Sequence, residues 1–390
     1  MSMKNVLIYY NFSHPLGGGD ILPLSFAEEL QKNNHVTLAV DSLAGFERSE
    51  KAFGFTLDAA RVSVVQLMPA GYRWDKHNVF LSFLRNRRLK ALARKADVCI
   101  SAVNIIDFGR PAHHFINFLS GVDCACVGSA AHGCKTALPF IARLKRFIGN
   151  RLIRPLVGMR SKRAIILSKQ EHVYPNSLYA KAQLENFYGA FDGSLFYPPT
   201  LFEIGSSDAK RKALRVICLG RINACKCITD IILIVERARG ISGRDIELVI
   251  AGPYNPNDAY VKRLEQMARS RAWISLKDGV FGRAKEELLL SGTYAVHARR
   301  DEEFGISVTE YLKAGLIPIV PNEGGSCEVV DNPALTYHAN EEAAQILARL
   351  IADSAFCDEQ RRKCMERAKA FSREAYLARQ EELLRRIVGY

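Results

Sequence analysis

The stretch of sequence that decides the fold is DEEFGISVTEYLKAGLIPIVPNEGGSCE, which spans residues 301–328. It contains a predicted helix, then a short apolar run over 316–320, then a glycine pair at 324–325. A helix followed directly by a short apolar strand and a glycine-rich loop is typical of a parallel sheet covered by helices. Two carboxylates frame the helix start, with Glu302 just before it and Glu310 inside the helix.

The helix start and its two carboxylates predict a binding site for a sugar diphosphate. A helix N-terminus presents free N–H groups and partial positive charge, which suits a diphosphate group. Carboxylates beside it accept hydrogen bonds from sugar hydroxyls. The competing interpretation is that Glu302 and Glu310 are solvated helix charges, but the intervening Phe304-Gly305 step and the glycine pair favour the binding site.

The same alternation of strand and helix extends through both halves of the chain. Strands are predicted over residues 6–10, 35–40, 62–67, 98–101 and 124–128, and again over 214–219, 247–251, 273–276, 294–297 and 316–320. Helices are predicted over residues 21–32, 80–95, 229–239, 259–270, 343–353 and 375–388. Because the strands are apolar and β-branched, we expect parallel sheets with helices on both faces. The predicted fold class is therefore α/β, with two doubly wound, Rossmann-like domains facing a cleft.

The double proline Pro198-Pro199 marks the predicted domain boundary, because proline neither continues a helix nor donates to a sheet. The pattern of strands and helices restarts directly after it. We expect an N-terminal domain over 1–200, a second domain over 201–374 and a C-terminal helix over 375–390. One possible arrangement has this helix pack back on the first domain.

The composition excludes several classes of protein. With 390 residues, of which 48% are hydrophobic and 24% charged, the chain is typical of a globular protein of two domains. It lacks the run of about 18 apolar residues that a membrane-spanning helix requires. Ten cysteines are present without a C-x-x-C pair, which favours free thiols and a cytoplasmic location. The absence of an Asp-x-Asp pair predicts that no metal is used.

Positive charge is concentrated in the first half of the chain, where residues 1–200 contain 25 Lys and Arg against 14 Asp and Glu. No acidic residue occurs between Asp123 and Glu171, and ten basic residues lie in that gap. Apolar residues at helical spacing within 136–163 predict a basic amphipathic helix that lies on an anionic membrane surface. The alternative is a helix that faces the core with a solvated basic side. Nucleic acid is not an expected partner, because aromatic residues are not interleaved with the basic ones.

Two glycine-containing loops follow predicted first strands. The run Gly17-Gly18-Gly19-Asp20 lets backbone approach a phosphate group, although a plain tight turn is the alternative and the spaced G-x-G-x-x-G of a dinucleotide fold is missing. In the second half, Gly220-Arg221 and Lys226 follow the first strand. These two cations suit a departing diphosphate, and ordinary surface charges are the alternative.

Together these elements resemble glycosyltransferase family 4, whose members are retaining enzymes of the GT-B fold. The most specific motif is a Glu, seven residues and a second Glu with Phe-Gly between them, which matches Glu302, Glu310 and Phe304-Gly305. Further matches are Gly220, Arg221 and Lys226 for a Gly-Arg-x4-Lys element, Gly324, Gly325 and Glu328 for a glycine pair before Glu, and Gly279-Val280-Phe281 for a loop near the nucleobase. The run 297–302 and the early triple glycine are weakly similar to the dolichol-linked α-1,2-mannosyltransferases.

The resemblance implies a role for each matching residue. Arg221, Lys226 and Glu302 would be catalytic, and the donor would be bound by Gly18, Gly19, Asn117, Val280, Phe281, Phe304, Gly305, Ile306 and Glu310. The first domain would hold the acceptor and the second the nucleotide sugar. Asn117 stands where family members often carry a His, and His113, His114 and His132 are the alternatives for that contact.

The implied reaction moves a sugar from a nucleotide sugar to a hydroxyl acceptor with retention of configuration. The donor, a UDP- or GDP-linked sugar, would be a co-substrate. The resemblance implies neither a cofactor nor a metal. The acceptor would be a glycan or a lipid-linked molecule, as in glycan or glycolipid assembly at the inner face of a membrane. The alternatives are a nucleotide-sugar epimerase of the same fold and a catalytically silent sugar-binding protein.

Overall fold

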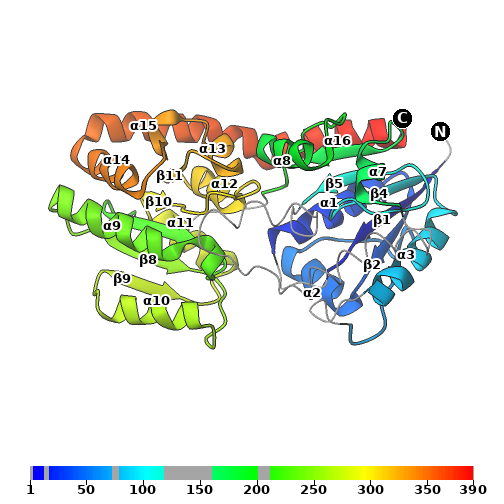
Figure 1. Ribbon diagram of the computed structural model, residues 1–390, viewed down its shortest axis with the longest axis horizontal. Helices are drawn as coiled ribbons and strands as arrows, with labels where there is room; N and C mark the ends of the chain where they lie inside the picture. Colours follow the sequence, from blue (N-terminus) through cyan, green and yellow to red (C-terminus); the bar gives the residue numbers. More distant parts are fainter. Residues whose placement is uncertain (1–2, 13–16, 73–78, 118–159, 201–210, 390) are drawn as a thin grey trace. The chain divides into compact units, whose positions relative to one another are not determined.

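The computed structural model describes residues 3–12, 17–72, 79–117, 160–200 and 211–389. The chain divides into two compact units, which Figure 1 shows in sequence colours. Unit 1 comprises Met1–Pro199 and Tyr376–Tyr390, and unit 2 comprises Thr200–Ala375. The chain therefore passes from unit 1 to unit 2 directly after the double proline and returns near the start of α16 (Arg373–Val388).

Unit 1 contains a six-stranded sheet in the order β3-β2-β1-β4-β5-β6, and all described strand pairs are parallel. Its strands are β1 (Asn5–Tyr10), β2 (His35–Val40), β3 (Val62–Gln66), β4 (Val98–Ser101), β5 (His113–Ile116) and β6 (His172–Pro175). Its helices are η1 (Gly18–Asp20), α1 (Ile21–Leu30), α2 (Leu43–Phe53), α3 (Val79–Ala93), α7 (Lys162–Ile166) and α8 (Leu178–Tyr188), to which most of α16 is added.

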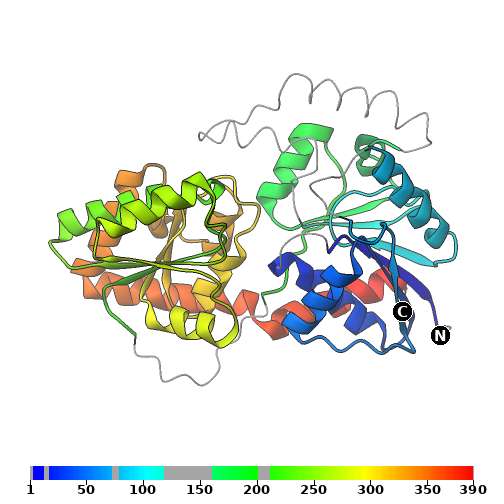
Figure 2. The same ribbon diagram turned by 90° about the horizontal axis from the view of Figure 1, so that it is seen from below.

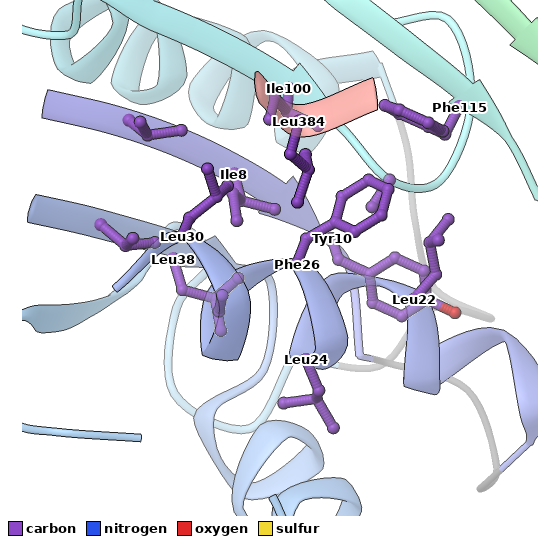
Figure 3. Close-up of a cluster of buried hydrophobic side chains, with 14 of the residues drawn as sticks. Ile8, Tyr10, Leu22, Leu24, Phe26, Leu30, Leu38, Ile100, Phe115 and Leu384 are labelled. Atoms are coloured by element: carbon purple, nitrogen blue, oxygen red, sulfur yellow. The ribbon is translucent and has the colours of Figure 1, made fainter. Parts of the chain in front are cut away.

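The core of unit 1 lies on both faces of its sheet, because successive side chains of β1 point to opposite sides. Ile8 and Tyr10 pack with α1, and Figure 3 shows this cluster around Phe26 and Leu384. Leu7 and Tyr9 pack on the other face with residues of α3. Figure 2 shows α16 (red) beside α1 and α2 (blue), with α3 (cyan) on the opposite side of the sheet.

The C-terminal helix α16 belongs to the core of unit 1. Tyr376, Leu384 and Val388 are buried in the same cluster as β1 and α1. Ser25 Oγ of α1 donates a hydrogen bond of 2.5 Å to Gln380 Oε1 of α16, and both residues are buried. Fully burying one large apolar side chain contributes about 1.5–3 kcal/mol, so this helix is an integral part of unit 1.

Unit 2 repeats the architecture with a sheet in the order β12-β11-β10-β7-β8-β9, again parallel throughout the described pairs. Its strands are β7 (Arg215–Leu219), β8 (Glu247–Ala251), β9 (Ile274–Lys277), β10 (Tyr294–Val296), β11 (Ile317–Pro321) and β12 (Thr336–Tyr337). Its helices are η4 (Ala224–Lys226), α9 (Ile228–Ser242), α10 (Ala259–Arg269), α11 (Gly282–Ser291), α12 (Ile306–Lys313), α13 (Gly325–Val330), η5 (Pro333–Leu335), α14 (Asn340–Ala352), α15 (Ser354–Ala368) and η6 (Lys369–Phe371).

The two sheets share one strand order, in which the chain first builds outward on one side and then switches to the other. The switch occurs between β1 and β4 in unit 1 and between β7 and β10 in unit 2. Ligands of doubly wound sheets bind at the carboxyl ends of the strands at such a switch point. These two positions are therefore where binding residues are expected.

The predicted fold class, α/β with two Rossmann-like domains, is confirmed. β5 and β6 were not predicted as strands, and the strand predicted over 124–128 lies outside the described residues. No helix of the described part of the chain is long and apolar enough to cross a bilayer.

Candidate functional site

An ion pair joins the two strands at the switch point of unit 2. β7 ends at Leu219 and leads into η4, which carries Lys226. β10 ends at Val296 and leads into the loop that carries Glu302. The Lys226 ammonium contacts the Glu302 carboxylate, across 76 residues of sequence. Two of the three predicted catalytic residues are therefore in direct contact.

The loop after β7 is held in place from two sides. Leu219 N donates to the Tyr311 hydroxyl at 2.6 Å, and that hydroxyl donates to Leu219 O at 3.3 Å, which ties the strand end to α12. On the other side, Gly252 lies so close to Gly220 that a Cβ on Gly252 would be 2.0 Å from the Gly220 carbonyl oxygen. Gly252 also has a φ of +148°, so a larger residue is excluded on both grounds.

Glu302 is surrounded by groups that favour its charged form. Only 8% of the residue is exposed, and this burial by itself raises the pKa of the carboxyl. Lys226, His297 and Arg299 outweigh burial and hold the pKa of Glu302 well below its usual range. His297 Nε2 is 3.4 Å from Glu302 Oε2, and Arg299 Nη1 is 3.8 Å from Oε1. Glu302 is thus a hydrogen-bond acceptor at neutral pH.

The glycine pair holds the loop that carries Glu302. Gly325 N donates a 2.7 Å hydrogen bond to the Glu302 carbonyl oxygen. A Cβ on Gly325 would lie 2.3 Å from the Glu303 carbonyl oxygen, and one on Gly324 would lie 2.5 Å from the Arg300 carbonyl oxygen. Only glycines allow the two backbone segments to approach this closely. The pair therefore positions Glu302 from β11, a role that the sequence did not assign.

The start of α12 carries the predicted backbone contacts. Gly305 is the N-cap residue, with a φ of +98°, so the first N–H groups, including that of Ile306, have no partner inside the helix. The Phe304 side chain is buried and stacks edge-on with Phe371 at 6.0 Å, so this side chain belongs to the core. Phe304 can contribute only its backbone to a ligand.

Two buried polar atoms at this carboxyl edge have no hydrogen-bond partner in the described structure. They are Asn223 Oδ1 after β7 and Ser326 Oγ after β11. A buried polar group without a partner costs about 1–3 kcal/mol, so native structures retain such groups mainly where a ligand or water can satisfy them. Two such atoms at the strand ends that flank β10 indicate a ligand site.

Glu310 lies on α12 and contacts a residue that the sequence did not indicate. Its Oε1 is 2.8 Å from Lys285 Nζ of α11. Lys285 N in turn donates to the Phe281 carbonyl oxygen at 3.4 Å, and the Phe281 ring is 52% exposed while Val280 is half-buried. Lys285 therefore links the predicted ribose residue to the predicted nucleobase loop.

Arg221, the third predicted catalytic residue, follows β7 but is not drawn into the ion pair. Its side chain is exposed, and it forms no ion pair with another described residue. A free guanidinium at a strand end can grip phosphate oxygens as a fork. The structure places Arg221 at the same edge of the sheet as Lys226. Arg221 does not share the ion pair that Lys226 forms with Glu302.

The predicted residues of unit 1 meet at its own switch point. Asn117, just after β5, donates to the Gly19 carbonyl oxygen at 2.8 Å and to the Ala102 carbonyl oxygen at 3.4 Å. Asp20 accepts hydrogen bonds from the Tyr10 hydroxyl at 3.0 Å and the Ser49 hydroxyl at 2.8 Å. The glycine loop with Gly18 and Gly19 is thus held at its C-terminal end, at Gly19 and Asp20.

Two of the alternatives to Asn117, His113 and His114, lie in the described structure and have other contacts. His114 is fully buried, with Nε2 3.0 Å from Glu171 Oε2. His113 stacks on His172 at 4.7 Å between ring centroids, and burial lowers the pKa of His113 to about 3. His132 and residues 136–159 of the predicted membrane helix lie outside the described residues.

Comparison with known proteins finds a family match within unit 2. Residues 202–371 match the model of the family described as glycosyl transferases group 1. The match covers most of unit 2 and less than half of the chain. A stretch of 54 residues is 43% identical to a GDP-Man:Man(3)GlcNAc(2)-PP-Dol alpha-1,2-mannosyltransferase from Yarrowia lipolytica, but it covers only 14% of this chain and 8% of that protein.

Solved structures show that the likeness in fold to glycosyltransferases extends over the whole chain. The sucrose-phosphate synthase of Thermosynechococcus elongatus is 15% identical with a TM-score of 0.72, over 99% of both chains. WaaG, a glycosyltransferase of lipopolysaccharide biosynthesis, is 14% identical with a TM-score of 0.69, over 99% of this chain and 100% of that one. Anabaena HepE, solved with UDP and glucose, is 15% identical with a TM-score of 0.67, over 98% and 99% of the two chains. The predicted GT-B fold, the resemblance to glycosyltransferases of that fold and the weak similarity to a dolichol-linked α-1,2-mannosyltransferase are therefore confirmed.

Proposed function

We propose that this group 1 glycosyltransferase moves a sugar from a UDP- or GDP-linked donor to a hydroxyl acceptor with retention of configuration. The observation that carries the proposal is the Lys226–Glu302 ion pair at the switch point of unit 2. Around it, Asn223 Oδ1 and Ser326 Oγ lack partners in the described structure, and a nucleotide sugar supplies both hydroxyls and phosphate oxygens to satisfy them.

Each of these residues contacts a different part of the donor. Glu302, held ionised, accepts hydrogen bonds from hydroxyls of the donor sugar. Lys226 turns its ammonium toward the diphosphate, and the exposed Arg221 adds a second cation as negative charge develops on the leaving group. The free N–H groups at the start of α12 face the same diphosphate. Glu310 binds the ribose, and Phe281 lies against the base.

The acceptor and the setting belong to the same proposal. We expect a glycan or lipid-linked acceptor, a cytoplasmic reaction at the inner face of a membrane, and a reaction that needs no metal. The described residues of unit 2 supply two cations, Lys226 and Arg221, where a metal would otherwise neutralise the diphosphate. Adding a chelator should therefore leave the rate unchanged, and a rate that requires a divalent cation would contradict this point.

A ligand screen followed by a transfer assay tests the proposal. Thermal shift with UDP-, GDP-, dTDP- and ADP-sugars should show stabilisation by one class, since a ligand of the native state stabilises it by mass action. Transfer from that donor to lipid-linked and soluble glycan acceptors should then form a product whose anomeric configuration, read by NMR, equals that of the donor. An inverted product would refute retention.

Two variants and a control locate the chemistry. Lys226→Met removes a preorganised cation and should lower kcat by about 10²–10³-fold. Glu302→Gln should also lower kcat. Lys262→Met, on the exposed side of α10, should leave kcat unchanged. An epimer formed without an acceptor would identify an epimerase instead. Donor binding without any transfer would identify a silent sugar-binding protein.

A further inference from the structure

Glu303 is a second carboxylate directly after Glu302, in the loop between β10 and α12. Its side chain is 17% exposed, so it is shielded from most of the solvent but not sealed off. One guanidinium lies near both carboxylates, because Arg299 Nη1 is 3.8 Å from Glu302 Oε1 and Arg299 Nη2 is 3.5 Å from Glu303 Oε2. The two carboxylates therefore lie close together at the carboxyl edge of the sheet of unit 2.

The backbone position of Glu303 is set by glycines on two sides. A Cβ on Gly325 would lie 2.3 Å from the Glu303 carbonyl oxygen, so the glycine pair packs directly against this residue. Gly305, two residues further along the chain, is the N-cap of α12. Glu303 thus lies between the residue proposed to bind the donor sugar and the helix start proposed to face the diphosphate. A donor that reaches from one to the other passes beside Glu303.

Carboxylates outnumber cations in the ion-pair cluster around Glu302. The three carboxylates of residues 301–303 share two cations, Lys226 and Arg299. His297 adds no positive charge at neutral pH, because burial lowers its pKa. Lys226 is also the cation proposed to stabilise the diphosphate, so a bound donor draws positive charge away from these carboxylates. A further negative charge on the donor sugar would therefore be repelled.

The environment of Glu303 also makes a nearby anion costly. Burial raises the pKa of Glu303, and Arg299 offsets only part of this effect. A ligand carboxylate beside Glu303 would raise this pKa further, because like charges disfavour the ionised form. Binding such a ligand therefore costs either the repulsion between two anions or the uptake of a proton. A ligand hydroxyl costs neither, because it donates a hydrogen bond to the carboxylate.

We propose that Glu303 is a specificity-determining residue, which makes the sugar end of the donor site accept neutral sugars and reject sugars that carry a carboxylate. The inference rests on the proposed function, because that function places the donor sugar beside Glu302. It goes further by naming the class of donor sugar, which the cations and the helix start do not determine.

Matched pairs of donors test the inference in the full chain. UDP-glucose and UDP-glucuronate, or GDP-mannose and GDP-mannuronate, differ only at C6, which carries a hydroxymethyl group in one donor and a carboxylate in the other. Isothermal titration calorimetry with the pair whose base the chain binds gives the ratio of the two Kd values. The unchanged chain should bind the neutral sugar more tightly. Glu303→Gln should narrow the ratio by about tenfold, mainly through tighter binding of the uronate, because a like charge is removed without a change in size.

A matched control separates this position from net charge. Glu323, on the loop after β11, is 50% exposed and is paired with Arg300. Glu323→Gln removes the same charge from the same edge of the sheet and should leave the ratio unchanged. Glu303→Ser is a second variant, which removes the charge with a smaller side chain and should shift the ratio in the same direction as Glu303→Gln. Circular dichroism confirms that each variant is folded.

Three results would overturn the inference while leaving the donor site intact. They are equal affinity of the unchanged chain for the two donors of a pair, a ratio that both Glu303 variants leave unchanged, and equal shifts in the Glu303→Gln and Glu323→Gln variants. Titration with UDP and GDP alone reads the donor site separately. If neither nucleotide binds, the proposed donor site is refuted and this inference with it, so the two failures are distinguishable.

Discussion

The ion pair between Lys226 and Glu302 predicts a measurable coupling of stability within unit 2. The two side chains are 24% and 11% exposed, so the pair is shielded but not sealed. Two unit charges 4 Å apart attract by about 4 kcal/mol at an effective dielectric of 20. Desolvation and side-chain ordering offset part of this attraction, so we expect a net coupling of about 1–3 kcal/mol.

Lys226→Met should destabilise unit 2 more than Glu302→Gln does. Without the ammonium, the Glu302 carboxylate remains buried, and Arg299 and His297 are its remaining ion-pair partners in the part of the chain that the structure describes. A buried charge that loses a counter-ion is costly. Glu302→Gln leaves an ammonium on the more exposed of the two side chains, where water can solvate it. The double variant should cost less than the sum of the two single ones.

Fluorescence of Trp273 provides the assay, because the chain has two tryptophans and Trp273 lies in unit 2. In a Trp74→Phe background, urea unfolding followed at Trp273 reports on that unit alone. The free energies of unfolding of the four proteins form a double-mutant cycle. Strictly additive single effects would refute the reasoning, because they would mean that the two charges do not sense each other in solution.

Three further predictions concern stability and binding. Gly325→Ala should destabilise unit 2 by about 1–3 kcal/mol, because the added Cβ would collide with backbone atoms of Glu303 and Phe304. Gly240→Ala, at an open position on α9, should stabilise unit 2 by about 1 kcal/mol, and urea unfolding measures both changes. Since the pKa of His113 is lowered to about 3 in the folded chain, the free energy of unfolding should fall as the pH drops below about 6.5, by at most about 1.4 kcal/mol per pH unit. Urea unfolding at several pH values measures this slope, and His113→Asn should flatten it. Asn117→Ala leaves the Gly19 carbonyl without its 2.8 Å partner and should raise the KM for the donor more than it lowers kcat, so unchanged kinetics would remove Asn117 from the donor site.

The sequence predicted the central strands well and the short outer ones poorly. β1 and β8 are continuous apolar runs, and the structure places them within one residue of their predicted bounds. β5 and β6 escaped prediction because each is only four residues long and begins with His. Such strands depend on pairing with neighbours, which a local pattern does not contain.

The site was predictable where a strand end positions it and unpredictable where two helices meet. Lys226 and Glu302 both follow predicted strands and both matched the family resemblance, and the structure brings these strands together at the switch point. Lys285 was missed, because its contact with Glu310 depends on how α11 packs against α12. The sequence indicated His297 only as a member of the run 297–302, and its position beside Glu302 is known only from the structure.

The proposed reaction requires Lys226 to serve two partners in turn, first Glu302 and then a diphosphate, and the surroundings of Glu302 are compatible with this. Before the donor binds, Lys226 neutralises the carboxylate. Once the ammonium turns to a diphosphate, Arg299 and His297 still face the two carboxylate oxygens, at 3.8 Å and 3.4 Å. Arg299 is itself shared with Asp301 and Glu303, at 2.9 Å and 3.5 Å, so it stays in the loop when Lys226 moves. Under the proposed function, Glu302 therefore remains ionised and accepts hydrogen bonds from the sugar while Lys226 stabilises the leaving group.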